Sequence, residues 1–297
     1  MDTCCGQNVV ASDGTAIAAR FFAPAGEARA AVRAAVLIVP AMGAPQSYYK
    51  PFAAWLAAQG FLVATFDYRG TGLSRPADLR GFAADILDWA RLDCAAMIEA
   101  TLTRATSARA PGIPLVWIGH SLGGQILPLV PNRARIAKIV MVATGSGYWR
   151  HYAPKALIGG WWLWHVAVPL ATRLCGYFPG KRLRKVGDLP KGVARQWRRW
   201  CLDPDYAAGA EGPAVRALYA AVETPIVSLS FTDDEYMSPR NAEALHGFYS
   251  GAPKAMKRIA PGDIGQTRIG HFGFFRAQHE HSLWRPHLLS ELALPAL

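Results

Sequence analysis

The sequence predicts an α/β fold: a mostly parallel central sheet with helices on both faces and a helical insertion between two of its strands. Short apolar runs alternate with segments of helical periodicity such as Phe82–Thr103. The apolar run Leu115–Ile118 ends in Gly119-His120-Ser121-Leu122-Gly123, a G-x-S-x-G motif. The alternation stops at Ser146 and resumes at Glu223, which marks the insertion.

The elements follow one another in an order that suits such a sheet. Asn8–Val10 and Ile17–Phe22 flank an Asp-Gly turn and predict an N-terminal hairpin. Further strands are expected at Ala35–Val39, Phe61–Phe66, Leu115–Ile118, Ile136–Val142, Pro225–Phe231 and Lys254–Ile259, and helices at Tyr48–Gln59, Phe82–Thr103, Ile126–Val130, Pro239–His246 and Gln278–Leu289. In open parallel sheets, sites lie at the carboxyl ends of the strands.

Length and composition indicate the domain organisation. The 297 residues, 52% of them hydrophobic, suffice for an α/β core at 1–145 and 223–297 and a helical cap at 146–222. The first residues show no basic segment followed by an apolar run, so we expect no secretory signal. The five cysteines are scattered without metal-like spacing, which favours free thiols in a cytoplasmic protein that has no metal site.

One segment of the predicted cap is unusually apolar. Ala156–Thr172 is 17 residues long, contains Trp161, Trp162 and Trp164, and has no Asp, Glu, Lys or Arg. A membrane span needs about 17–25 residues, and the glycine pair and proline within the segment argue against one. We expect a cap helix whose three tryptophans line an apolar pocket, with peripheral contact to a membrane surface as the alternative.

The formal net charge of +11 is concentrated in this region. Residues 151–222 hold 11 Lys and Arg against 4 Asp and Glu, including the basic run 181–185. No nucleic-acid recognition motif accompanies the charge, so we expect no nucleic-acid partner. A solvated basic face is the first interpretation, and attraction of anionic lipid or an acidic substrate is the second.

The G-x-S-x-G motif predicts that Ser121 is a nucleophile. A strand, a sharp turn and a helix expose the serine hydroxyl above the sheet on a strained backbone. Side chains two positions away would collide, which accounts for Gly119 and Gly123. The start of a helix beside the serine stabilises developing negative charge.

A serine hydroxyl needs a base, and the base needs an acid that orients it. Asp233 and Asp234 follow the strand Pro225–Phe231, and both are candidates for the acid. His271 follows the last strand between two glycines and is the candidate base, whereas His120 is expected to point to the other side of the turn.

An oxyanion needs two hydrogen-bond donors aimed at the developing charge. One is expected to be the backbone N–H of Leu122, directly after the nucleophile. The other is expected from the loop Pro40–Pro45, where the N–H of Met42 is the candidate. A merely stiff turn is the alternative interpretation of this loop.

The chain resembles α/β-hydrolases, near the branch of serine aminopeptidases and monoacylglycerol lipase-like proteins. The resemblance rests on Pro40-Ala41-Met42-Gly43, Asp67-Tyr68-Arg69-Gly70-Thr71-Gly72-Leu73-Ser74, Gly119-His120-Ser121-Leu122-Gly123-Gly124, Asp233-Asp234-Glu235 and Gly270-His271-Phe272-Gly273-Phe274-Phe275. It implies a triad of Ser121, His271 and Asp234, because Asp234 matches the register of the family acid, and it implies no metal or organic cofactor. Asp233 is the alternative acid. The family's frequent His-Gly is replaced here by Pro40-Ala41.

These features predict a serine hydrolase that cleaves small, apolar carboxylic esters through an acyl-enzyme. An acyltransferase using the same intermediate and a non-catalytic ligand-binding member of the fold are the alternatives. An aminopeptidase would need acidic residues in the cap to hold a free amine, and the basic charge of residues 151–222 argues against it. The loop Asp67–Ser74 is interpreted as structural rather than as a pocket wall.

Overall fold

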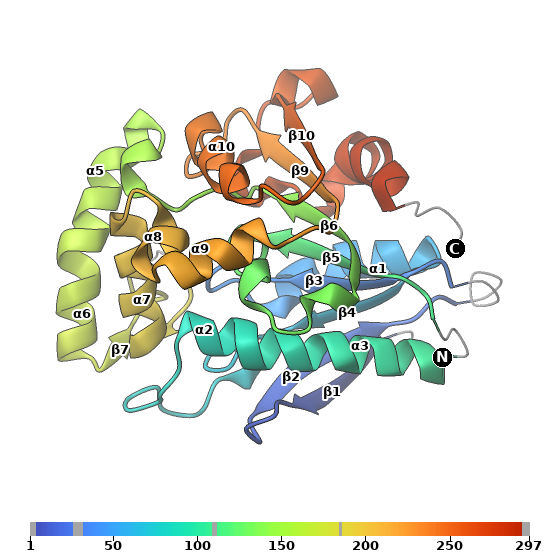
Figure 1. The fold of residues 1–297 in the computed structure, drawn as a ribbon, viewed down its shortest axis with the longest axis horizontal. Coiled ribbons are helices and arrows are strands. Elements are labelled where there is room, and N and C mark those ends of the chain that lie inside the picture. Colours follow the sequence, from blue (N-terminus) through green and yellow to red (C-terminus); the bar gives the residue numbers. More distant parts are fainter. Residues whose placement is uncertain (1–3, 26–31, 109–111, 184–185, 293–297) are drawn as a thin grey trace.

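The computed structural model describes residues 4–25, 32–108, 112–183 and 186–292. Within them, eight strands form one sheet in the order β1-β2-β4-β3-β5-β6-β9-β10 (Figure 1). The strands are β1 (Cys4–Val10), β2 (Ala16–Phe22), β3 (Ala35–Val39), β4 (Leu62–Phe66), β5 (Leu115–His120), β6 (Ile136–Val142), β9 (Ile226–Phe231) and β10 (Lys254–Ile259). β2 pairs antiparallel with β1 and β4, and the other neighbours are parallel. The predicted fold class is confirmed.

Two apolar clusters lie on opposite faces of this sheet. Along β3, Leu37 and Val39 belong to one cluster and Val36 and Ile38 to the other, because successive side chains of a strand point to opposite faces. The helices α3 (Ala95–Ser107), α9 (Pro213–Ala220) and α10 (Pro239–Phe248) contribute to the first cluster. The helix α1 (Lys50–Ala58) and the C-terminal helical segment Glu280–Leu288 contribute to the second. Helices therefore cover both faces, as predicted.

The helix predicted at Phe82–Thr103 begins later than expected. Asp85 caps it, since its side chain accepts the N–H of Asp88 while Asp88 accepts the N–H of Asp85. The helix runs through α2 (Ile86–Asp88), a π-helical turn at Trp89–Cys94 and α3. The capping box sets the start of this helix at Asp85, which the apolar stripe alone does not indicate.

The prediction of a helix at Ile126–Val130 is wrong. The helix after the serine, α4, spans only Leu122–Gln125, and a single 3₁₀ turn follows at Leu127–Leu129. Pro128 has no N–H to continue the helical hydrogen bonds, and Pro131 favours the extended backbone that Val130 adopts.

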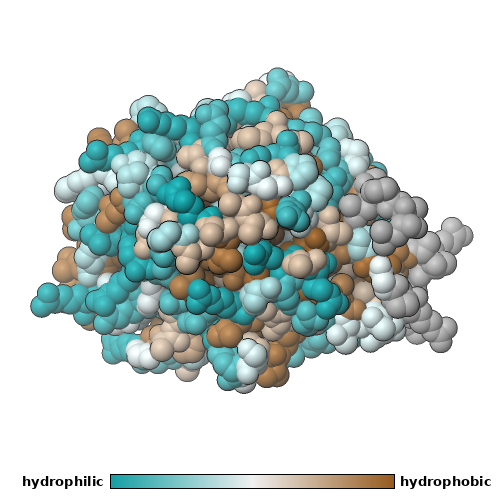
Figure 2. Space-filling view, viewed as in Figure 1, coloured by the Kyte–Doolittle hydropathy of each residue, from teal (hydrophilic) through white to brown (hydrophobic). Residues whose placement is uncertain are grey.

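Residues between β6 and β9 are mainly helical. Their described elements include α5 (Pro154–Trp162), a π-helical turn (Leu163–Ala167), α6 (Val168–Leu174), the two-stranded sheet of β7 (Tyr177–Phe178) and β8 (Leu189–Pro190), α7 (Lys191–Leu202), α8 (Tyr206–Ala210) and α9. In Figure 1, α5, α6 and α7 lie together beside the sheet. On the same side of the molecule, Figure 2 shows brown apolar residues among teal hydrophilic ones. By contrast, Val215 and Tyr219 of α9 belong to the cluster on the sheet.

A buried arginine joins three segments of the core. The Arg69 side chain contacts Asp93 of the π-helical turn (Nε to Oδ1, 2.7 Å) and Asp13 of the hairpin turn (2.6 Å). Asp93 also accepts the N–H of Arg69, and Trp89 donates to the Arg69 carbonyl. Nearby, Asp67 accepts the N–H groups of Gln46 and of Leu73. These contacts confirm the structural interpretation of the loop Asp67–Ser74.

We expect Asp93→Asn to lower the free energy of unfolding by about 3 kcal/mol, because it leaves a buried guanidinium without its buried counter-charge. The matched control is Glu99→Gln. Glu99 pairs with Arg135 at 3.5 Å on the surface, where such pairs contribute less than about 1 kcal/mol. Urea unfolding measures both losses, and equal losses in the two variants would contradict the assignment.

Candidate active site

Ser121 lies on a sharp turn between β5 and α4, at the carboxyl end of a central strand. Its φ of 51° and ψ of −112° lie in a region that residues with a side chain rarely adopt. The N–H of Ser121 donates to the Val142 carbonyl at the end of β6 (3.0 Å). The strained turn is thereby tied to the neighbouring strand of the sheet.

Glycines around the serine are packed against backbone. A Cβ atom on Gly123 would lie 2.1 Å from the carbonyl oxygen of Val39, and one on Gly119 would lie 2.5 Å from the nitrogen of Gly124. A Cβ on Gly124 would meet the side chain of Thr144 at 2.6 Å. Backbone obstacles cannot turn aside as the end of a side chain can, so the turn requires glycine at 119 and 123, as predicted.

His271 and Asp234 are hydrogen-bonded to each other. The distance from His271 Nδ1 to Asp234 Oδ2 is 2.8 Å, and both side chains are buried. The other carboxylate oxygen accepts the N–H groups of Tyr236 and Met237, each at 2.8 Å. Burial by itself raises the pKa of Asp234, but the His271 imidazole and these N–H groups outweigh it and hold the pKa below its usual value. Asp234 is therefore held in its ionised, accepting form.

Asp233 makes different contacts from those of its neighbour. Its Oδ2 accepts the backbone N–H groups of Ile269 and Gly270, each at 2.9 Å. These are the two residues directly before His271. Of the two predicted acids, Asp234 thus contacts the imidazole, and Asp233 holds the backbone that carries it.

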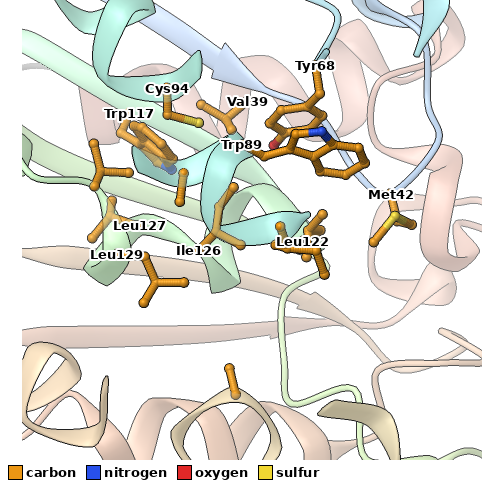
Figure 3. Packing of buried hydrophobic residues seen from close by; sticks show 14 of the residues in the cluster. Val39, Met42, Tyr68, Trp89, Cys94, Trp117, Leu122, Ile126, Leu127 and Leu129 are labelled. Carbon is orange, nitrogen blue, oxygen red and sulfur yellow. The ribbon is translucent and has the colours of Figure 1, made fainter. Parts of the chain in front are cut away.

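Two backbone N–H groups beside Ser121 are available to a ligand. Leu122 is the first residue of α4, so its N–H has no acceptor within the helix. The Ala41 N–H donates to the Tyr49 hydroxyl, while the Met42 N–H has no acceptor among the described residues. Met42 and Leu122 belong to one buried cluster, which Figure 3 shows together with Tyr68 and Trp89.

Ser121, His271, Met42 and Leu122 border one cavity of about 480 Å³. No hydrogen bond joins the Ser121 hydroxyl to the imidazole in this conformation, and such bonds are often long in unliganded enzymes. The remaining walls are mainly apolar and aromatic. They include residues that sequence reasoning missed, notably Tyr152, Trp197, Tyr236, Met237 and Phe272. Of these, only Phe272 is next to a predicted site residue, and Tyr236 and Met237 follow Asp234 by two and three positions.

The prediction that three tryptophans line the pocket is only partly correct. Trp164 is buried and borders the cavity. Trp161 and Trp162 do not border it, and 50% and 41% of their surfaces are exposed. The wall of the cavity is made by Gly159, Gly160 and Leu163, which share one face of the helix. Trp161 and Trp162 point to its outer face.

No group of three or more His, Cys, Asp or Glu side chains suited to a metal ion occurs in the part of the chain that the structure describes. In the same part, every helix is too short or too polar to pass through a bilayer.

The family model described as serine aminopeptidase, S33, matches residues 30–193, which is more than half of the chain. The chain belongs to this family. It is therefore an enzyme of the α/β-hydrolase fold, and the predicted resemblance is confirmed. No curated protein sequence matches it significantly.

Solved structures share the fold of this S33-family chain at low sequence identity. A soluble variant of monoglyceride lipase from Saccharomyces cerevisiae has a TM-score of 0.62 and 17% identity, over 88% of this chain and 86% of that one. An esterase from Exiguobacterium antarcticum has a TM-score of 0.58 and 14% identity, over 97% and 99%. A thermostable carboxyl esterase from Bacillus coagulans has 0.57 and 13%, over 88% and 91%. At such identities the likeness establishes the fold alone.

Proposed function

We propose that this α/β-hydrolase cleaves carboxylic esters with apolar acyl groups, using Ser121 as nucleophile, His271 as base and Asp234 as the orienting acid. The observation that carries the proposal is the buried hydrogen bond between His271 Nδ1 and Asp234 Oδ2 at the edge of the cavity that Ser121 borders. Because Nδ1 donates to the carboxylate, Nε2 is the nitrogen left to accept the serine proton.

The reaction begins when His271 takes the proton of Ser121 and the serine oxygen attacks the ester carbonyl. The N–H groups of Leu122 and Met42 stabilise the oxyanion of the tetrahedral intermediate. Protonated His271 then gives its proton to the leaving alcohol as the C–O bond breaks, and the acyl group remains on Ser121. Water, activated by the same imidazole, releases the acid and restores the serine.

The cavity wall favours an apolar acyl group. Leu163, Trp164, Trp197, Met237 and Phe272 present hydrocarbon and aromatic surface to the cavity. The charged groups among the lining residues are Lys155, Glu235 and Arg268, and Glu235 and Arg268 pair with each other at 3.3 Å. Monoglyceride lipase and carboxyl esterases share this fold, which agrees with an ester substrate.

The outer face of the helix beside the cavity suits an anionic lipid surface. In the part of the chain that the structure describes, five of nine exposed large apolar side chains lie on residues 154–174: Ile158, Trp161, Trp162, Leu170 and Leu174. The segment has two basic residues, Lys155 and Arg173, and no acidic one. Tryptophans with flanking cations are typical of helices that lie in a membrane interface. Lys181 and Arg182 follow nearby, and Arg184 and Lys185 of the predicted basic run lie outside the described residues.

The catalytic assignment predicts that a fluorophosphonate probe labels the wild-type protein and not Ser121→Ala. We expect Asp234→Asn to lower kcat for p-nitrophenyl butyrate about 10³- to 10⁴-fold, because the imidazole loses the carboxylate that orients it. Asp233→Asn is the matched control, since its amide oxygen can still accept the N–H groups of Ile269 and Gly270. An equal loss in both variants, or labelling of Ser121→Ala, would overturn the assignment.

The apolar wall predicts a preference for longer acyl chains. We expect kcat/KM to rise at least about tenfold from p-nitrophenyl acetate to the octanoate, because each buried methylene contributes about 0.8 kcal/mol. Leu163→Trp fills the cavity and should reduce this preference, whereas Leu73→Trp, at an exposed position elsewhere, should not. An enzyme fastest on the acetate would contradict the apolar substrate.

The exposed helix face predicts binding to vesicles of phosphatidylglycerol at low salt. The variant Ile158→Ser/Leu174→Ser should sediment with them much less than wild type does, because it removes the two most exposed apolar side chains of the helix. Val10→Ser/Met256→Ser is the matched control, with exposed apolar residues elsewhere on the surface. If wild type fails to bind, or both variants bind alike, this face is not a lipid contact.

A further inference from the structure

A chain of buried hydrogen bonds runs behind the candidate site. The Ala41 N–H donates to the Tyr49 hydroxyl oxygen (2.9 Å). The Tyr49 oxygen lies 2.8 Å from His120 Nδ1, and His120 Nε2 lies 3.1 Å from the carbonyl oxygen of His271. Tyr49 and His120 have no exposed surface, and neither borders the cavity. The chain thus touches the site from its buried side.

Chemistry fixes the direction of every bond in this chain. A carbonyl oxygen only accepts, so Nε2 of His120 must carry the proton that points to His271. Burial, aided by repulsion from the His271 imidazole when that ring is protonated, lowers the pKa of His120 to about 3, so the ring is neutral and carries no second proton. Nδ1 is therefore an acceptor, and the Tyr49 hydroxyl donates to it. The Tyr49 oxygen is left to accept the Ala41 N–H, so each donor in this chain has one acceptor.

This chain links three parts that come from different strands. Ala41 directly precedes Met42, whose N–H is the proposed second oxyanion donor, in the loop after β3. His120 is the last residue of β5 and directly precedes Ser121. The carbonyl that ends the chain belongs to His271 itself, after β10. The backbones of the donor loop, the nucleophile and the base are thus joined by two side chains.

Aromatic packing holds the two side chains in place. The Phe275 ring lies 4.9 Å from the Tyr49 ring and 4.8 Å from the His120 ring, centroid to centroid. The neighbouring Tyr48 donates its hydroxyl to the carbonyl of Phe272, directly after the base. Rings packed at these distances leave the hydroxyl and imidazole little freedom to rotate. The chain therefore acts as a fixed spacer and not as an adaptable contact.

We propose that Tyr49 and His120 are positioning residues that fix the distance between the oxyanion N–H groups and the His271 imidazole. The inference rests on the proposed acyl transfer at Ser121. It adds a second support for the base: Asp234 orients the imidazole ring, and His120 holds the backbone from which the ring extends. Small displacements of such groups are costly, because the donors must meet an oxyanion that exists only in the transition state.

The first experiment compares Tyr49→Phe with wild type on p-nitrophenyl butyrate. The substitution keeps the ring and its packing but leaves the Ala41 N–H and His120 Nδ1 without partners. We expect kcat to fall about 100-fold and KM to change little, because positioning acts on the transition state. The control is Tyr249→Phe, which removes an equally buried hydroxyl that donates to the Gly124 carbonyl. This hydroxyl takes no part in the hydrogen bonds through Tyr49 and His120.

The second experiment uses two amide replacements of the histidine. His120→Gln can place an N–H near the position of Nε2 and donate to the His271 carbonyl, whereas His120→Asn can offer only an acceptor to Tyr49. We expect His120→Gln to retain clearly more of the wild-type kcat than His120→Asn. We also expect Tyr49→Phe/His120→Asn to lose less than the product of the two single losses, because both substitutions cut one chain.

The outcomes separate this inference from the proposed function. Absence of fluorophosphonate labelling in folded wild type would refute the acyl-enzyme itself. With labelled wild type, unchanged kcat in Tyr49→Phe, a loss no larger than that of Tyr249→Phe, or equal activities of His120→Gln and His120→Asn would each overturn the positioning role. Thermal unfolding followed by circular dichroism sets an assay temperature at which every variant compared is folded, so that a smaller folded fraction is not counted as a loss in kcat.

Discussion

The close approach of the first turn of α4 to the carboxyl end of β3 is the constraint on which the candidate site depends. Gly123, in the first turn of α4, sits against the Val39 carbonyl at the end of β3, where any side chain would collide. That contact forces Ser121 into its positive-φ turn. It also starts α4 at Leu122 and places the N–H of Leu122 beside the loop that carries Met42. One backbone contact thus sets the nucleophile and both proposed donors.

The other half of the site comes from loops after β9 and β10, and charge organises it. Asp233 and Asp234 are adjacent in the sequence but serve different partners. One accepts backbone N–H groups of the segment that carries His271, and the other accepts the imidazole. Each of the two carboxylates accepts hydrogen bonds from its own set of donors. The base is therefore held through its ring by Asp234, through the preceding backbone by Asp233 and through its carbonyl by His120.

The sequence allowed the sheet and the serine turn to be predicted because both leave local signals. The central strands are buried on both faces, so they appear as continuous apolar runs, and the turn requires glycine at 119 and 123. The contacts that distinguish Asp233 from Asp234 come from residues more than thirty positions away, and no local pattern records them. The apolar run Ile126–Val130 predicts a longer helix after Ser121 than the structure has, because Pro128 cannot continue the helical hydrogen bonds. The hydrogen bonds through Tyr49 and His120 also leave no local pattern, because only the folded structure brings these two residues together.

The tryptophans near the cavity illustrate a further limit of prediction from the sequence, which does not tell which face of this helix borders the cavity. Between α5 and α6 the backbone makes a π-helical turn, and the Trp164 carbonyl accepts the side chain of Arg198 from α7 (2.5 Å). Trp164 thereby faces inward while Trp161 and Trp162 stay outside. The same helix therefore forms both a wall of the cavity and an exposed apolar face. A displacement of this helix would alter the cavity and the exposed face together, whereas Ser121, Asp234 and His271 rest on the ends of the sheet. Placement of the reacting groups and access of the substrate thus depend on separate parts of the fold.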